Sequence, residues 1–248
     1  MKLSIVIPAH NEAGSIAGTL RELHTALTAE NIPHELLVVN DNSRDETETV
    51  LLGLAGEIPT LRHLTNPGPN GFGLAVRLGL ENMQGAAVAI VMADGSDSPL
   101  DVVRFYRKMQ EGFDCVFGSR FMKGSEVLDY PVFKKLLNRL FNLMIKTVFR
   151  LRYNDVTNAF KMYRAEVIQG LKPFLSHHFN LTVELPLKAI IRGYSYAVLA
   201  NSWQNRKSGE SKLKIKEMGS RYLFIVMYCL IEKSLCSQDY AKKTAVKA

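Results

Sequence analysis

Residues 86–99 read AAVAIVMADGSDSP, and this segment decides the fold class. Its first half, Ala86–Met92, is an uninterrupted apolar run, which is typical of a strand buried on both faces. Polar residues follow at once, and Pro99 then begins a helical pattern. Because strands buried on both faces belong to parallel sheets that helices cover on both sides, the segment predicts an α/β fold.

Similar strand and helix patterns lie on both sides of this segment. Strands are predicted at residues 2–7, 35–39, 61–64 and 114–117, and helices at residues 43–53, 74–83 and 99–109. The helix at 43–53 is expected to begin with a capping box, because Ser43 lies three residues before Glu46. A further amphipathic helix is predicted from an apolar stripe of Ile16, Leu20, Leu23 and Leu27. Alternating elements of this kind predict a doubly wound, Rossmann-like and mostly parallel sheet with flanking helices.

The ends of the predicted strands carry the chemically informative residues. Ligands of open α/β sheets bind beyond the carboxyl ends of the strands, where Asp41, Asp94 and Asp97 are expected to meet. Buried carboxylates are costly unless they contact a cation or hydrogen-bond donors. A divalent metal that bridges a diphosphate would satisfy them, although any single Asp here can equally cap the helix that follows.

Composition and charge narrow the class of protein. The chain has 248 residues, enough for a full core, and its three cysteines show no paired spacing, which fits a reducing compartment. The net charge of +7 is unevenly distributed, with 10 Lys and Arg against 17 Asp and Glu in residues 1–131, and 21 against 7 in residues 132–248. The longest late apolar run, Tyr222–Ile231, is far shorter than the roughly 20 residues that a transmembrane helix needs. Secretion and a transmembrane span are therefore not expected.

Several motifs in order resemble those of one family. PAHNE (residues 8–12), NDNS (40–43), NGFGLA (70–75), ADGSD (93–97) and GSRF (118–121) resemble the family 2 inverting glycosyltransferases of GT-A fold. DVTNAFKMYR (155–164) and RKSGESKL (206–213) are similar to segments of dolichol-phosphate mannosyltransferases and their polyprenyl-phosphate relatives. The resemblance implies a hexose donor of the GDP-mannose or UDP-glucose type and a polyprenyl or dolichyl phosphate acceptor.

The resemblance also assigns roles to residues of this chain. Residues implied to bind the donor are Pro8, Ala9, Asn11, Glu12, Asp41, Gly71, Gly73 and Asp94. Residues implied to bind the acceptor phosphate are Arg120, Arg206, Lys207, Ser211 and Lys212. Asp94, Arg120 and Arg206 are the implied catalytic residues.

One position departs from the family pattern. Met92 stands where the family has its first metal-binding Asp, and a thioether is a poor ligand for Mg²⁺ or Mn²⁺. Binding of either ion is therefore expected to rest on Asp94, with Ser96, Asp97 and the donor phosphates.

Residues 132–152 predict an amphipathic helix at a membrane surface. The segment contains six basic residues and no acid, and one stripe carries Phe133, Leu136, Leu137, Leu140, Phe141, Met144 and Val148. The alternative is a helix that packs this stripe on the core. We expect a glycosyltransferase domain over residues 1–213, with this helix inserted, and a C-terminal helix and tail over residues 214–248. The prediction is peripheral association with the cytoplasmic membrane face, no nucleic-acid partner, and either a homo-oligomer or a membrane-anchoring partner.

The nature of the acceptor determines the expected mechanism. A phosphate is already anionic at pH 7, so its oxygen can displace the nucleoside diphosphate with inversion and without a general base. Transfer to a saccharide hydroxyl instead would require a base, for which Glu184 and Asp97 are the candidates. A third possibility is a nucleotide-sugar-binding subunit without turnover, which the substitution at Met92 would explain.

Overall fold

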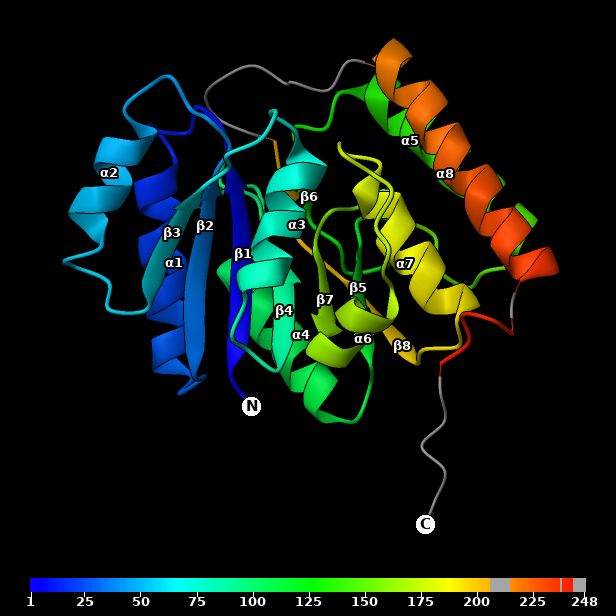
Figure 1. Cartoon of the computed structure of the whole chain (residues 1–248), viewed down its shortest axis with the longest axis horizontal. Coiled ribbons are helices and arrows are strands. Elements are labelled where there is room, and N and C mark those ends of the chain that lie inside the picture. The colour runs from blue at the N-terminus through cyan, green and yellow to red at the C-terminus, as the bar shows by residue number, and fades with distance from the viewer. Residues whose placement is uncertain (206–214, 237, 243–248) are drawn as a thin grey trace.

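The computed structural model describes residues 1–205, 215–236 and 238–242. In this part of the chain seven strands form one sheet in the order β3-β2-β1-β4-β7-β5-β8 (Figure 1). Its strands are β1 (Leu3–Ala9), β2 (His34–Asn40), β3 (Leu61–Thr65), β4 (Ala87–Ile90), β5 (Cys115–Ser119), β7 (Lys161–Arg164) and β8 (Tyr196–Ala200). Two short strands, β6 (Val127–Leu128) and β9 (Trp203–Gln204), pair separately.

The predicted parallel sheet is confirmed, with one antiparallel strand that the sequence pattern did not predict. β1 pairs in parallel with β2 and β4, and β5 pairs in parallel with β8. β7 enters between β4 and β5 and runs antiparallel to both. Four residues that read KMYR carry no strand periodicity, so burial within the sheet rather than local pattern fixes this strand.

Helices cover both faces of the sheet and bury alternate strand residues. On one face, α1 (Ile16–Ala29), α2 (Thr47–Leu54) and α4 (Pro99–Gln110) pack on a cluster that includes Ile5 and Ile7. On the other face, α3 (Phe72–Asn82), α6 (Ala165–Gly170) and α7 (Leu181–Ile191) pack on a cluster that includes Val6. The alternation follows from the two-residue period of a strand.

Two long helices, α5 (Val132–Phe149) and α8 (Ile215–Leu235), lie side by side at one edge of the molecule (Figure 1). The Phe141 and Tyr222 rings join them at 5.4 Å between centroids, and Lys233 Nζ donates to the carbonyl of Phe149 at 3.0 Å. α5 ends three residues before the predicted end, because Arg150 takes a left-handed conformation with φ of 54°. Among the described residues, no helix has the length and hydropathy that crossing a bilayer requires.

Candidate functional site

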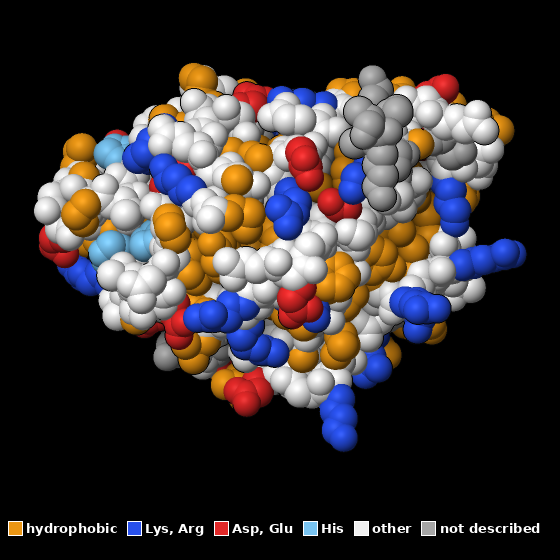
Figure 2. All heavy atoms as spheres, turned by 90° about the horizontal axis from the view of Figure 1, so that it is seen from below, with side chains coloured by type: hydrophobic (Ala, Val, Ile, Leu, Met, Phe, Trp, Pro, Cys, Tyr) orange, Lys and Arg blue, Asp and Glu red, His pale blue; other side chains and the backbone are white. Residues whose placement is uncertain are grey.

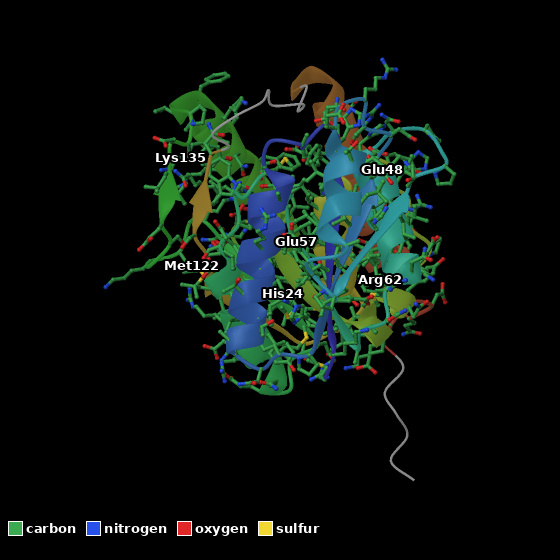
Figure 3. All side chains as sticks on the ribbon, turned by 90° about the vertical axis from the view of Figure 1, so that its left-hand side faces the viewer. His24, Glu48, Glu57, Arg62, Met122 and Lys135 are labelled. Atoms are coloured by element: carbon green, nitrogen blue, oxygen red, sulfur yellow. The ribbon has the colours of Figure 1, made fainter. Side chains whose placement is uncertain are left out.

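A cavity of about 880 Å³ opens at the carboxyl ends of the strands, where α5 and α8 form one of its walls. Of the residues that the sequence singled out, those that line it are Pro8, Ala9, Glu12, Asp41, Gly71, Asp94, Ser96, Asp97 and Arg120. Figure 3 shows Lys135, near the start of α5, toward the upper end of the molecule, where these strands terminate. The sheet therefore brings together residues that are more than one hundred positions apart in the sequence.

Asp41 fixes the part of the cavity between β2 and α3. Its Oδ2 accepts the Gly71 N–H at 2.8 Å, and its Oδ1 accepts Asn66 Nδ2 at 2.7 Å. Its own N–H donates to the carbonyl of Ala9 at 2.7 Å. The Asp41 carboxylate thus ties three loops together and faces the cavity as part of a preformed wall.

Asn11 has a different place from the other predicted donor-binding residues, because it is exposed and does not line the cavity. It adopts a left-handed φ of 54°, donates its N–H to Ser43 Oγ at 2.9 Å, and accepts the Arg44 N–H on Oδ1 at 2.7 Å. The predicted capping box at Ser43 is wrong: α2 begins at Thr47 without a side-chain cap, and the Ser43 hydroxyl holds the Asn11 loop instead.

Gly71 and Gly73 permit a close approach between the start of α3 and the backbone of residues 176–178. A Cβ added at Gly71 would lie 2.5 Å from the His177 carbonyl oxygen, and one at Gly73 would lie 2.6 Å from the His177 carbonyl carbon. Gly71 lines the cavity and Gly73 does not. The geometry therefore gives Gly73 a packing role beside the site.

Asp94, Ser96 and Asp97 lie together on the cavity wall after β4. Asp94 Oδ1 accepts the Ser96 N–H at 3.1 Å, and Asp97 Oδ2 accepts the Met92 N–H at 3.0 Å. Burial raises the pKa of Asp97 to about 7; the charges of Asp94 and Asp101 add to the rise, while the Met92 N–H and Arg120 oppose it.

These donors fit a divalent cation only in part. In the described part of the chain no three His, Cys, Asp or Glu side chains are arranged to hold a metal. Met92 lines the cavity but offers a soft sulfur, and Asp97 directs one carboxyl oxygen to the backbone. Mg²⁺ sites commonly use one or two carboxylates with substrate phosphates and water. The donor set fits a cation whose coordination substrate phosphates and water complete. It does not fit a cation that the protein coordinates alone.

Arg120 is paired inside the cavity with a residue to which the sequence analysis gave no role. Its Nε and Nη2 donate to the Asp155 carboxylate at 2.9 and 2.8 Å, and its guanidinium lies over the rings of Phe121 and Tyr130. Burial alone would lower the pKa of Arg120, but the charge of Asp155 and the hydrogen bonds to it, with smaller effects of Tyr130 and Tyr153, together raise that pKa. Arg120 is therefore a fixed cation in a defined orientation.

Five more candidate residues came from the sequence: four in the segment 206–213, and Glu184 in α7. Arg206, Lys207, Ser211 and Lys212 lie outside the described residues. Glu184 is fully buried, pairs with Lys188 at 2.6 Å, and accepts the N–H groups of Leu175 and Ser176. The expectation that Glu184 is available as a general base is wrong, because both of its oxygens hold the 175–176 segment.

The cavity also contains residues that sequence reasoning did not assign. They are Tyr130, Lys134, Asn138, Thr157 and Tyr222, among others. Trp203, for which the sequence leaves stacking on a sugar and core packing both open, also lines the cavity. The Trp203 and Tyr130 rings are 4.9 Å apart. The DVTN motif at residues 155–158 was the available signal for Thr157, whereas Tyr130, just before α5, and Asn138, on α5, stand in no motif.

Beside the cavity, α5 and α8 expose an apolar surface, defined here as the outer face. On α5 the exposed fractions are 67% for Phe133, 55% for Leu136, 54% for Leu140, 39% for Met144 and 42% for Val148. On α8 the exposed apolar residues are Leu223, Phe224, Met227, Ile231 and Leu235. By contrast, acidic and basic side chains are interspersed at the opposite end of the molecule (Figure 2). The alternative that the α5 stripe packs on the core is wrong, because Asn142, Ile145 and Phe149 face inward instead.

Fold and site together define an α/β protein with a cavity at the carboxyl ends of a mostly parallel sheet, where ligands of open α/β sheets bind. The model of the family described as "Glycosyl transferase family 2" matches residues 4–171, and the chain belongs to this family.

Curated relatives have related names. The chain is 28% identical over 222 residues to a dolichol-phosphate mannosyltransferase of Pyrococcus furiosus, covering 87% of this chain and 60% of that protein. It is 27% identical to a polyprenol monophosphomannose synthase of Mycolicibacterium smegmatis, covering 84% and 80%. It is 28% identical to an undecaprenyl-phosphate mannosyltransferase of Micrococcus luteus, covering 86% and 88%. The chain thus spans less than two thirds of the Pyrococcus protein.

Solved structures share the GT-A fold. Glucosyl-3-phosphoglycerate synthase from Mycobacterium tuberculosis in complex with UDP superposes with a TM-score of 0.68 at 17% identity, over 94% of this chain and 79% of that chain. The same enzyme with Mn²⁺, UDP and phosphoglyceric acid gives a TM-score of 0.68 at 17% identity, over 94% and 78%. At this identity the likeness concerns the fold alone.

Proposed function

We propose that this chain is an inverting glycosyltransferase that moves a hexose from a nucleotide-diphospho-sugar to a polyprenyl phosphate at a membrane surface. The names of the three curated relatives support a polyprenyl-phosphate acceptor and a mannosyl donor. The nucleotide is a finer proposal, with GDP-mannose and UDP-glucose as the donors to test first.

One observation carries the proposal: the cavity, which contains the charged groups of Asp94 and Arg120, and the apolar outer face share the same helix. Lys134, Leu137 and Phe141 of α5 line the cavity, while Phe133, Leu136 and Leu140 of the same helix are exposed. A molecule with a charged head and a long hydrocarbon tail fits this arrangement, because its head can enter the cavity while its tail stays in the bilayer.

The basic residues of α5 favour an anionic membrane. Lys134, Lys135, Arg139, Lys146 and Arg150 accompany the outer face, and each basic residue near such a surface contributes about 1 kcal/mol. We therefore propose peripheral association with the cytoplasmic membrane face. A homo-oligomer or a membrane-anchoring partner remains a further prediction from the sequence.

In the proposed mechanism the residues of the chain supply position and charge, not a proton acceptor. The acceptor phosphate is an anion that attacks the anomeric carbon, and the nucleoside diphosphate leaves from the opposite side with inversion. Arg120, which Asp155 holds in orientation, is one of the described cations that line the cavity and is proposed to bind the acceptor phosphate. The wall around Asp41 and Gly71 would position the nucleotide, with Pro8, Ala9 and Glu12.

A divalent cation, when bound, would neutralise charge on the leaving diphosphate. Asp94 would hold it with Ser96 and Asp97, next to the donor phosphates that complete its coordination. Arg206, Lys207, Ser211 and Lys212 stay predicted acceptor-phosphate residues. Arg206→Ala and Lys212→Ala are expected to raise the acceptor KM more than the donor KM.

Transfer to a saccharide hydroxyl is the second candidate, and one observation favours it. Asp97 faces the cavity, and its pKa of about 7 suits a general base. The two candidates differ in whether an uncharged alcohol can serve as the acceptor.

A paired acceptor assay separates these functions. The protein is incubated with labelled GDP-mannose or UDP-glucose, with Mg²⁺ or Mn²⁺, and with either geranylgeranyl phosphate or geranylgeraniol. The proposal expects an organic-extractable, acid-labile labelled product from the phosphate and none from the alcohol. Equal transfer to the alcohol, or transfer to saccharides only, would contradict it, and tight donor binding without any transfer would indicate a non-catalytic subunit. Asp94→Ala is expected to remove most of the activity.

A further inference from the structure

The inward face of α5 is unusual for a helix that packs on a protein, because two amides, Asn138 and Asn142, contribute to its contact with the body. Asn142 is 1% exposed and Asn138 is partly buried, and the apolar residues Phe141, Ile145 and Phe149 pack on the core beside them. Buried amides are costly unless they are hydrogen-bonded, so their partners determine how the helix sits.

The partners form a directional chain centred on Thr157. The Thr157 hydroxyl donates to Asn138 Oδ1 at 2.8 Å and accepts from Asn142 Nδ2 at 2.9 Å. Asn138 Nδ2 donates to the Tyr130 hydroxyl at 2.8 Å, and Asn142 Oδ1 accepts the Thr157 N–H at 3.3 Å. We call Tyr130, Asn138, Asn142 and Thr157 the amide network. A shift of α5 by one residue would break these bonds together.

The amide network leads directly to Arg120. Thr157 Oγ1 lies 3.4 Å from Asp155 Oδ1 and 3.5 Å from Arg120 Nη2. Tyr130, at the other end of the network, places its ring 5.5 Å from the guanidinium carbon of Arg120. The helix that carries the outer face is thus connected on its inner side to the fixed cation of the cavity.

We propose that the amide network positions α5 relative to Arg120, so that a phosphate on a membrane-embedded chain meets the guanidinium in the reactive orientation. This inference rests on the proposed function and deepens it. Thr157 is in this view a positioning residue: it acts through Asp155, Arg120 and α5, and its loss should affect the lipid acceptor and spare the nucleotide donor.

The test is Thr157→Val, which keeps the shape of the side chain and removes the hydroxyl. The KM for geranylgeranyl phosphate in mixed micelles is expected to rise about tenfold, because the hydroxyl loses its bonds to Asn138 and Asn142 at the centre of the amide network. The donor KM and the calorimetric Kd for GDP or UDP are expected to stay within about twofold of the wild-type values. The hydrogen bonds of the hydroxyl go to Asn138, Asn142, Asp155 and Arg120, and none goes to Asp41 or Gly71 of the predicted nucleotide site. Thr157→Ser retains the hydroxyl and should restore the acceptor KM.

The matched control is Thr147→Val on the exposed side of α5, where the hydroxyl bonds only to the carbonyl of Leu143. Any of three outcomes would overturn the inference. They are an equal rise in both KM values, an unchanged acceptor KM in Thr157→Val, and a Thr157→Ser variant as impaired as Thr157→Val. Thermal unfolding checks whether Thr157→Val is folded. If it is not, Tyr130→Phe is the second variant, and a smaller rise confined to the acceptor KM is expected.

A binding measurement separates this inference from the proposed function. Calorimetric titration with geranylgeranyl phosphate requires no turnover. A wild-type protein that binds this lipid more tightly than Thr157→Val but transfers no sugar contradicts the proposed function and supports the amide network. A wild-type protein that does not bind it overturns both.

Discussion

The helices α1 and α5 both carry an apolar stripe at spacings of three and four, but α1 buries its stripe while α5 exposes it. Leu20 and Leu23 of α1 are 0% exposed, whereas Leu136 and Leu140 of α5 are 55% and 54% exposed. An apolar stripe therefore predicts that one side of a helix lies in an apolar environment and the other side in a polar one. It does not tell whether the apolar side is the protein core or a membrane.

The largest effect that would separate the two helices is on stability. Leu23→Ala in α1 should lower the free energy of unfolding by about 3 kcal/mol, because it removes buried methyl groups and leaves a cavity. Leu140→Ala in α5 should change it by less than about 0.5 kcal/mol. Urea unfolding followed by circular dichroism checks both, and equal losses would remove the contrast.

Membrane binding should show the reverse order. The double variant Leu136→Glu with Leu140→Glu is expected to weaken binding to anionic vesicles about 100-fold, since it removes two apolar anchors and adds like charge. Leu100→Glu is a matched control, because Leu100 is a 69% exposed leucine on α4, away from the outer face. Co-sedimentation with phosphatidylglycerol vesicles provides the measurement. Undiminished binding of the double variant would mean that another surface contacts the membrane.

Charge on α5 should contribute a smaller and salt-dependent part. Lys146→Gln with Arg150→Gln is expected to weaken binding to the same vesicles by roughly tenfold or more at low salt, at about 1 kcal/mol per basic residue. The loss should shrink as the salt concentration rises, because screening reduces these attractions. Lys108→Gln with Arg107→Gln on α4 is the control pair and should leave binding unchanged. A loss that salt does not alter would contradict an electrostatic origin.

The smallest expected effect is on the pH dependence of the free energy of unfolding, and it comes from Glu35 on β2. Burial alone would raise the pKa of Glu35, but hydrogen bonds from Ser4, the Gln84 N–H and Arg62 outweigh it and lower that pKa below its usual 4.5. The stabilisation from Glu35 is therefore fully present above pH 4.5 and is lost as the pH falls toward the lower pKa of the folded state. Glu35→Gln should flatten this acid loss in unfolding measurements. An unchanged slope would show that Glu35 is not its source.

Much of the site could be predicted because local pattern and topology agree. The apolar run at residues 86–92 predicted a buried strand, and parallel strands place their carboxyl ends at one edge. Asp41, Asp94, Asp97 and Arg120 were therefore expected together, and all four line the cavity.

Other residues could not be placed because their roles depend on contacts far away in the sequence. Glu184 was a candidate general base, yet its partners Lys188, Leu175 and Ser176 hold it away from the cavity. Ser43 matched a capping box, but Asn11 uses its hydroxyl. The division of the chain at residue 213 falls outside the described residues and stays a prediction.

The sequence by itself determined the alternating elements and the polar ends of the strands, because periodicity and turn residues act over a few neighbours. Only the tertiary structure decided which side of α5 faces the protein, how β7 enters the sheet, and that Asp155 holds Arg120. These outcomes depend on which groups, distant in the sequence, hydrogen-bond to a buried amide, pair with a strand or neutralise a buried charge. No local pattern contains that information.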